Sequence, residues 1–172
     1  MNQANRLSAP SLRQGAPAAR ASHSLVFLLA AGLLAGLPLA ARADGPATPT
    51  DLPGGKIVTP EQTRQLVDKK AALLIDTRSP VNFGKGHVPT AISVAYGEKS
   101  DKVAAFDASL DKFDMSKLPA DKNANVVFYS DGPTGWKSYK GAVLSIKAGY
   151  KNVMYMRGGW SEWTAKGLPE AK

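Results

Sequence analysis

NVVFYSDGPTGWK, residues 125–137, is the stretch of this 172-residue chain that decides the fold. After Asn125, residues 126–129 are all β-branched or aromatic, which predicts a core strand. A loop containing glycine and proline follows over residues 130–135. A helix is predicted from Trp136 to Ala148, ended by Gly149, because glycine often follows the last helical residue. The stretch therefore predicts a strand, a loop and a helix in succession.

The same alternation continues upstream. A short strand at residues 56–58 precedes a helix that begins with the capping-box residues Thr59 and Gln62. A solid apolar run, residues 71–75, then stops at Asp76, as a strand covered on both faces would.

Further segments complete the pattern. We expect a loop at residues 78–89, a short apolar stretch at 91–94, and one or two helices with a loop between 96 and 122. A last strand at residues 153–156 leads through a glycine turn into a tail helix at 160–166. Strands alternating with helices predict an α/β domain, in which helices flank both faces of a central, mostly parallel sheet. Ligands of such sheets lie beyond the carboxyl ends of the strands.

The first 43 residues have the layout of a secretory signal peptide. A basic leader without acids precedes an apolar run at residues 25–39, and Ala41-Arg42-Ala43 is a small-x-small cleavage pattern. We expect cleavage after Ala43 and Sec-type export, so that the mature protein is periplasmic or secreted without a stable membrane anchor. A retained anchor is the alternative, although the run is shorter than the roughly 20 residues that span a bilayer.

Residues 44–55 are rich in proline, glycine, threonine and alanine, and we interpret them as a flexible linker. The remaining chain, residues 56–170, is expected to form one domain. Four of the 22 basic residues precede residue 44, which leaves 18 bases against 14 acids, a net charge of +4. The lysines are scattered, so nucleic acid is not an expected partner.

The chain contains no cysteine, which excludes disulfides, thiolate metal ligands and cysteine nucleophiles. His87 is the only histidine after residue 43 and has no cysteine neighbours. We therefore expect neither a metal site nor a cofactor.

Four segments stand out over nearly the whole of residues 56–169. They are LIDTR at 74–78, GHVPTAI at 86–92, VVFY at 126–129 with KSYKGA at 137–142, and RGGWSEW at 157–163. Together, and in this order, they resemble the rhodanese-like domain family. The resemblance implies the rhodanese fold and, where the family's cysteine is present, sulfur transfer through a covalent persulfide.

The resemblance places the family's nucleophile in the loop after the core strand. The first position there is Ser130, and against the exported subgroup with Cys-x-x-Cys-Trp the two cysteine positions read Gly132 and Gly135. A serine needs an adjacent base to act as a nucleophile, and none is identified. We expect no catalytic residue in this loop, which is degenerate at Ser130, Asp131, Gly132 and Gly135.

The loop is still a candidate anion site, because amides at a helix N-terminus attract negative charge. Lys137 stands where the family usually has arginine, and a plain solvent-facing lysine is the alternative. The negative charge of Asp131 would repel an anion. One hypothesis is that its carboxylate folds inward and accepts hydrogen bonds from the loop amides itself. The candidate anion-binding residues are Ser130, Thr134, Gly135, Trp136, Lys137 and Ser138.

Other polar residues are expected to brace loops rather than to react. Trp160 and Trp163 lie three apart on one predicted helix, so both are expected in the core. The bracing residues are Asp76, Arg78, His87 and Arg157.

Three functions remain open. The missing cysteine predicts a non-catalytic module that binds a protein partner or a small anion. A thiosulfate sulfurtransferase is supported by family resemblance alone, and fold does not imply function. An accessory factor of a periplasmic oxidation system is suggested by the Cys-x-x-Cys-Trp subgroup.

Overall fold

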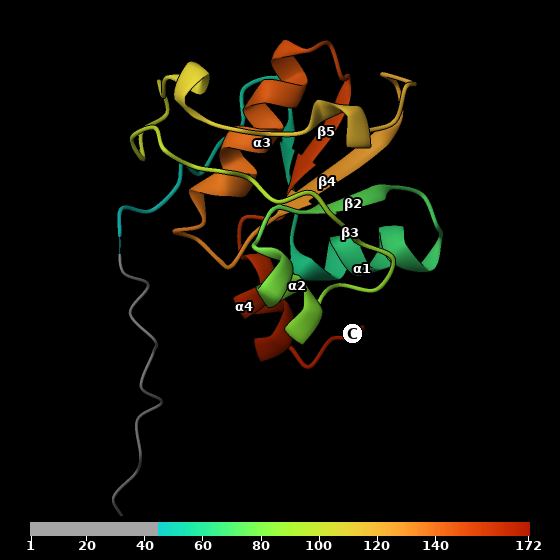
Figure 1. The fold of residues 1–172 in the computed structure, drawn as a ribbon. Helices are drawn as coiled ribbons and strands as arrows, with labels where there is room; N and C mark the ends of the chain where they lie inside the picture. The colour runs from blue at the N-terminus through green and yellow to red at the C-terminus, as the bar shows by residue number, and fades with distance from the viewer. Residues whose placement is uncertain (1–44) are drawn as a thin grey trace, which may run out of the picture. The chain divides into compact units, whose positions relative to one another are not determined.

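Five parallel strands form the centre of the described part of the chain, residues 45–172 of a computed structural model (Figure 1). The predicted signal peptide lies outside these residues. The strands lie in the order β1-β5-β4-β2-β3. Their bounds are β1 Lys56–Ile57, β2 Leu73–Asp76, β3 Ile92–Ser93, β4 Asn125–Tyr129 and β5 Asn152–Tyr155.

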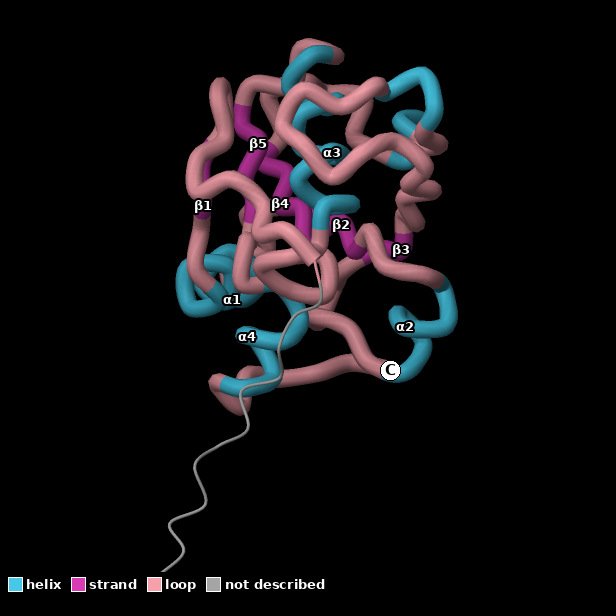
Figure 2. Tube along the Cα trace, turned by 90° about the vertical axis from the view of Figure 1, so that its left-hand side faces the viewer, coloured by secondary structure: helices cyan, strands magenta, loops and turns pink. Residues whose placement is uncertain are grey.

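Helices cover both faces of this sheet (Figure 2). Helix α3 lies on one face, and α1, α2 and α4 contribute to the other. The predicted α/β fold with a parallel sheet is therefore confirmed. The helix bounds are α1 Pro60–Asp68, α2 Pro80–Lys85, α3 Trp136–Lys147 and α4 Gly159–Ala165. Within residues 45–172, none of the helices is both long and apolar enough to cross a membrane.

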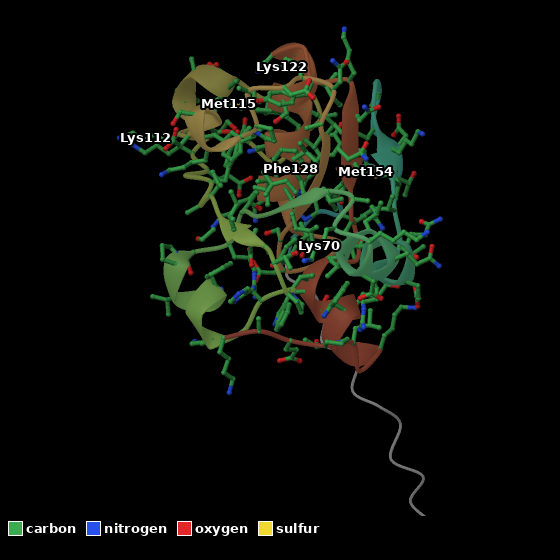
Figure 3. All side chains as sticks on the ribbon, turned by 90° about the vertical axis from the view of Figure 1, so that its right-hand side faces the viewer. Lys70, Lys112, Met115, Lys122, Phe128 and Met154 are labelled. Atoms are coloured by element: carbon green, nitrogen blue, oxygen red, sulfur yellow. The ribbon has the colours of Figure 1, made fainter. Side chains whose placement is uncertain are left out.

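Alternating side chains of the central strand β4 fill two separate cores. Val126 and Phe128 face α3, whereas Val127 and Tyr129 face α1 and α4. All four are fully buried, and Phe128 lies near the middle of the molecule in Figure 3. A strand covered on both faces needs this near-continuous apolar sequence, because its side chains point alternately to each side.

Local signals account for the starts of α1 and α2. The capping box is confirmed, since Thr59 Oγ1 accepts from the Gln62 amide and Gln62 Oε1 accepts from the Thr59 amide. The segment expected to be a loop from 78 to 89 contains the short helix α2. Ser79 caps α2 by accepting from the Asn82 amide, and Pro80 occupies its first turn.

The expectation of one or two helices between 96 and 122 is only partly met. Two single 3₁₀ turns, Ala108–Leu110 and Met115–Lys117, are present there. Asp107 and Asp114 cap these turns through short-range bonds to amides two residues ahead. Such local bonds compete with a continuing α-helix, which explains why the turns remain short.

Candidate functional site

The loop that joins β4 to α3, residues 130–135, lies at the carboxyl end of the sheet. The start of α4 holds it in place: the Trp160 amide donates to Ser130 O at 2.8 Å and the Ser161 amide to Asp131 O at 2.9 Å. Gly159 makes this approach possible. It has φ +58, and a Cβ there would lie 2.5 Å from Ser130 O.

Two amides of the expected anion cradle are already bonded within the loop. The Gly135 amide donates to Gly132 O at 2.8 Å, and the Trp136 amide donates to Thr134 O at 3.1 Å. Asp131 is exposed, and its carboxylate accepts no hydrogen bond from any residue between 45 and 172. The hypothesis that Asp131 folds into the cradle is wrong. The loop carbonyls satisfy these amides, so the carboxylate keeps its hydration instead.

Ser130, the first residue of the loop, is buried. The residue is 1% exposed, and its Oγ has no hydrogen-bond partner among the described residues. A Cβ added at Gly135 would lie 2.9 Å from Ser130 Cβ, so the side chain packs against the glycine that caps α3. The Ser130 hydroxyl is covered, and none of residues 45–172 accepts its proton in a hydrogen bond, whereas a nucleophilic serine needs an adjacent base.

The other anion candidates lie around the same loop, but two are engaged elsewhere. Trp136 is buried, and its Nε1 donates to Pro46 O at 2.8 Å. Ser138 Oγ donates to Gly135 O at 3.1 Å. Thr134 and Lys137 are half-buried. The structure therefore brings the six candidates together without leaving all of them free to bind an anion.

Asp76 and Arg78 form a buried ion pair at the end of β2. Arg78 Nη2 donates to Asp76 Oδ2 at 2.6 Å and to Gly86 O at 2.7 Å. Burial opposes the Arg78 charge, but the Asp76 carboxylate outweighs it and raises the Arg78 pKa. The guanidinium also lies over the Trp160 ring at 4.7 Å, so Trp160 is half-buried against Arg78 while Trp163 is fully buried in the core. These contacts join the end of β2, the segment after α2 and the start of α4.

Tyr129 closes the floor of this region. Its hydroxyl accepts from the Val88 amide at 3.1 Å. Burial raises the Tyr129 pKa well above its ordinary value, and the nearby Asp76 charge raises it further. The phenol therefore stays neutral and serves as a fixed hydrogen-bonding group between β4 and the loop before β3.

His87 lies on the segment after α2. Its ring stacks on Phe83 with centroids 3.8 Å apart, and Nδ1 lies 3.1 Å from Phe83 O. Its backbone pairs with Ala171 near the chain end. Within residues 45–172, no group of three or more metal-ligating side chains occurs.

A family model described as the rhodanese-like domain matches residues 59–166. The chain belongs to this family. The chain is 29% identical over 107 residues to a sulfurtransferase of Allochromatium vinosum, covering 62% of this chain and 85% of that protein.

Solved structures show the same fold. A thiosulfate sulfurtransferase from Pseudomonas aeruginosa has a TM-score of 0.51 at 21% identity, covering 68% of this chain and 20% of that chain. The BH2092 protein from Bacillus halodurans has a TM-score of 0.52 at 18% identity, covering 67% of this chain and 76% of that chain. The likeness to these structures concerns the rhodanese fold alone.

Residues 46–49 lie outside the matched rhodanese-like region but contact its site loop. The Thr48 amide donates to Pro133 O at 2.8 Å, and Thr48 Oγ1 donates to the same oxygen at 2.9 Å. Arg157 Nη2 donates to Thr48 O at 3.0 Å, and its Nε to Pro49 O at 3.2 Å. These residues belong to the expected linker, 44–55. Composition gives no sign of the contact, because all but one of these bonds use the main chain of the segment.

Proposed function

We propose that this rhodanese-like domain is a non-catalytic binding module, which contacts a protein partner through the surface formed by loop 130–135 and the first turn of α3. One observation carries the proposal: the first position after β4 holds Ser130, whose hydroxyl is buried and unpartnered among the described residues. A serine cannot carry a transferable persulfide, and an alkoxide needs an adjacent base.

The polarity of the loop favours a protein partner over a small anion. The Gly135 and Trp136 amides are bonded to loop carbonyls. The exposed Asp131 adds a negative charge at the loop surface. A small anion would meet this charge with few free donors, whereas a cationic side chain of a protein would be attracted to it.

A small anion is the second candidate, on a different observation. Lys137, a half-buried cation, lies in the first turn of α3 directly after the loop. Thiosulfate, sulfate and phosphate titrated into the protein and followed by calorimetry separate the two candidates. We expect no saturable binding below about 1 mM, which corresponds to roughly 4 kcal/mol of binding free energy. Saturation at lower concentration would favour the anion.

The protein-partner proposal is tested by charge reversal. A photo-crosslinking group at position 134 is expected to capture a partner in the source cell, and Asp131→Arg is expected to abolish that capture. Asp101→Arg is the matched control, since Asp101 is also exposed but lies in a different loop. Equal capture by both variants would contradict a role for the Asp131 surface.

Two alternative functions also have some support. The A. vinosum relative is named a sulfurtransferase, which supports a thiosulfate sulfurtransferase if another group replaces the missing thiol. Similarity to the exported Cys-x-x-Cys-Trp subgroup supports an accessory role in a periplasmic oxidation system, which neighbouring genes would test.

We also propose that the protein is exported. The basic leader, the apolar run at residues 25–39 and the Ala41-Arg42-Ala43 pattern support Sec-type secretion. Mass spectrometry of the protein from its source cell is expected to find a chain that begins at Asp44. A chain that retains residues 1–43 would indicate an anchor instead.

A further inference from the structure

Three aromatic side chains form a row beside the site loop. Trp136 and Tyr139 of α3 meet edge to face with centroids 5.6 Å apart, and Tyr139 meets Tyr155 of β5 at 6.0 Å. Each is at most 4% exposed. Two of them present polar atoms to the segment before the domain: Trp136 Nε1 donates to Pro46 O, and Tyr155 OH lies 3.0 Å from Thr48 Oγ1.

The segment on this row reads Pro46-Ala47-Thr48-Pro49, a P-x-x-P sequence. It is neither helix nor strand. P-x-x-P segments favour the extended polyproline conformation, and they dock on aromatic-lined grooves through carbonyl oxygens that protrude from the chain. Here the carbonyls of Pro46, Thr48 and Pro49 all accept from domain side chains.

We propose that Trp136, Tyr139, Tyr155 and Arg157 form a binding site for proline-containing extended peptides, and that residues 46–49 fill it in cis. The donors match this class of ligand, because an indole N–H and a guanidinium bind peptide carbonyls without requiring a particular side chain. Within the segment only Thr48 is fully buried, at 2% exposed, while Pro46 and Ala47 are exposed. The contact therefore uses mainly the backbone carbonyls of the segment, to which the buried Thr48 hydroxyl adds its own bonds.

This occupied site also controls the loop that carries the proposed function. Thr48 bonds Pro133 O twice, and Pro133 lies in the middle of loop 130–135. Trp136, which binds Pro46, is the first residue of α3 after that loop. The cis segment thus holds the loop at two points. Its displacement by a P-x-x-P peptide of another protein would release the loop and expose Arg157. The regulatory part of this inference rests on the proposed binding role of the loop.

Hydrogen exchange of the full chain tests the cis contact. Thr48→Val removes the hydroxyl that bonds Pro133 O and Tyr155 OH while keeping the side-chain shape. We expect amide exchange in residues 130–137 to increase roughly tenfold, the change expected from loss of one to two net hydrogen bonds. Thr50→Val is the matched control, because Thr50 is exposed, and it is expected to leave exchange unchanged.

A peptide added in trans tests the ligand class. The peptide GPATPTDL, which copies residues 45–52, is expected to shift the Trp136 indole N–H resonance of Thr48→Val, and GAATATDL is expected not to. The wild-type chain should respond less, because its tethered segment competes at high effective concentration. Unchanged exchange in Thr48→Val, or an equal response to both peptides or to neither, would overturn the proposal. Sulfur transfer by the wild-type chain would instead refute the proposed function and leave these readouts untouched.

Discussion

Two buried polar sites, one in the loop before α3 and one on α3 itself, differ in how their polar atoms are paired. In the loop, Ser130 Oγ is buried without a hydrogen-bond partner among the described residues. One turn into α3, the fully buried Lys140 ammonium is surrounded by acceptors. We refer to the second site as the Lys140 cluster, which consists of Tyr96, Glu98, Ser100, Asp111 and Lys140.

In the Lys140 cluster, hydrogen-bond acceptors and carboxylates surround the buried ammonium. Lys140 Nζ donates to Ser100 O at 3.0 Å and to Ser100 Oγ at 2.8 Å. Glu98 Oε1 lies 2.9 Å from the ammonium as an ion pair without a directed hydrogen bond, and Asp111 Oδ2 lies 3.8 Å away. A buried ammonium requires such partners, because its desolvation is costly. The cluster fixes the segment between β3 and β4 to α3.

Asp111 is the acceptor that organises this segment. Its carboxylate accepts from the Lys99 and Ser100 amides, both at 2.7 Å, and from the Tyr96 hydroxyl at 2.8 Å. Burial opposes its charge, but these hydrogen bonds and the one from Ser100 Oγ hold its pKa well below the ordinary range.

The contrast separates a cluster that holds the fold together from the loop in which Ser130 takes the place of the family's cysteine. In the Lys140 cluster every charge has partners, so we expect a change there to destabilise the domain. The buried Ser130 hydroxyl makes no hydrogen bond within residues 45–172, so we expect its loss to be tolerated. We infer that the rhodanese-like fold is maintained independently of the family's nucleophile position.

The largest effect is expected from Lys140→Met, which leaves the Glu98 and Asp111 carboxylates without their buried cation. Removal of one partner of a buried ion pair costs about 3–5 kcal/mol. Urea unfolding measures the difference, and Lys147→Met, at an exposed position of the same helix, is the control. A loss below about 1 kcal/mol for Lys140→Met would remove the contrast between the two sites.

A smaller and pH-dependent effect is expected from Asp111→Asn, at roughly 2–3 kcal/mol near neutral pH, because bonds to a charged acceptor are stronger. Since the folded pKa of Asp111 lies below its unfolded value, its contribution is present above pH ~4 and is lost as the pH falls towards the folded value. Wild-type stability should therefore drop more steeply than that of Asp111→Asn between pH 5 and pH 3, about one pH unit either side of the unfolded pKa near 4. Parallel curves would contradict the role of the charge.

The smallest effect is expected from Ser130→Ala, and the same substitution at Ser100 provides the comparison. Ser100→Ala removes bonds to Lys140 and Asp111 and is expected to cost about 1.5–3 kcal/mol. Ser130→Ala removes a hydroxyl that holds no bond among the described residues and is expected to change stability by less than about 0.5 kcal/mol. Thermal unfolding of the two variants compares them directly. Equal losses would show that Ser130 does hold the loop.

Much of the fold follows from local sequence. The apolar run of β4 predicts a strand covered on both faces, and Thr59 with Gln62 predicts the start of α1. Family resemblance locates the site loop and the missing cysteine. These features depend on residues that are close in the chain, so sequence patterns can predict them.

The remaining features depend on contacts between distant residues. Lys140 lies on a helix that looks ordinary in sequence, and its partner Ser100 is 40 residues away. Thr48 binds Pro133 across 85 residues, through a segment whose composition suggests a flexible linker. The inward-folding hypothesis for Asp131 failed because the bonds inside loop 130–135 depend on backbone geometry rather than on residue type.

A thiosulfate:cyanide sulfurtransferase assay on the wild-type chain tests the central claim most directly. The thiosulfate sulfurtransferase of P. aeruginosa, run alongside, is the positive control. The buried, unpartnered Ser130 predicts thiocyanate formation at the rate of the protein-free background. Turnover above that background, proportional to protein concentration, would contradict a non-catalytic role for this rhodanese-like domain.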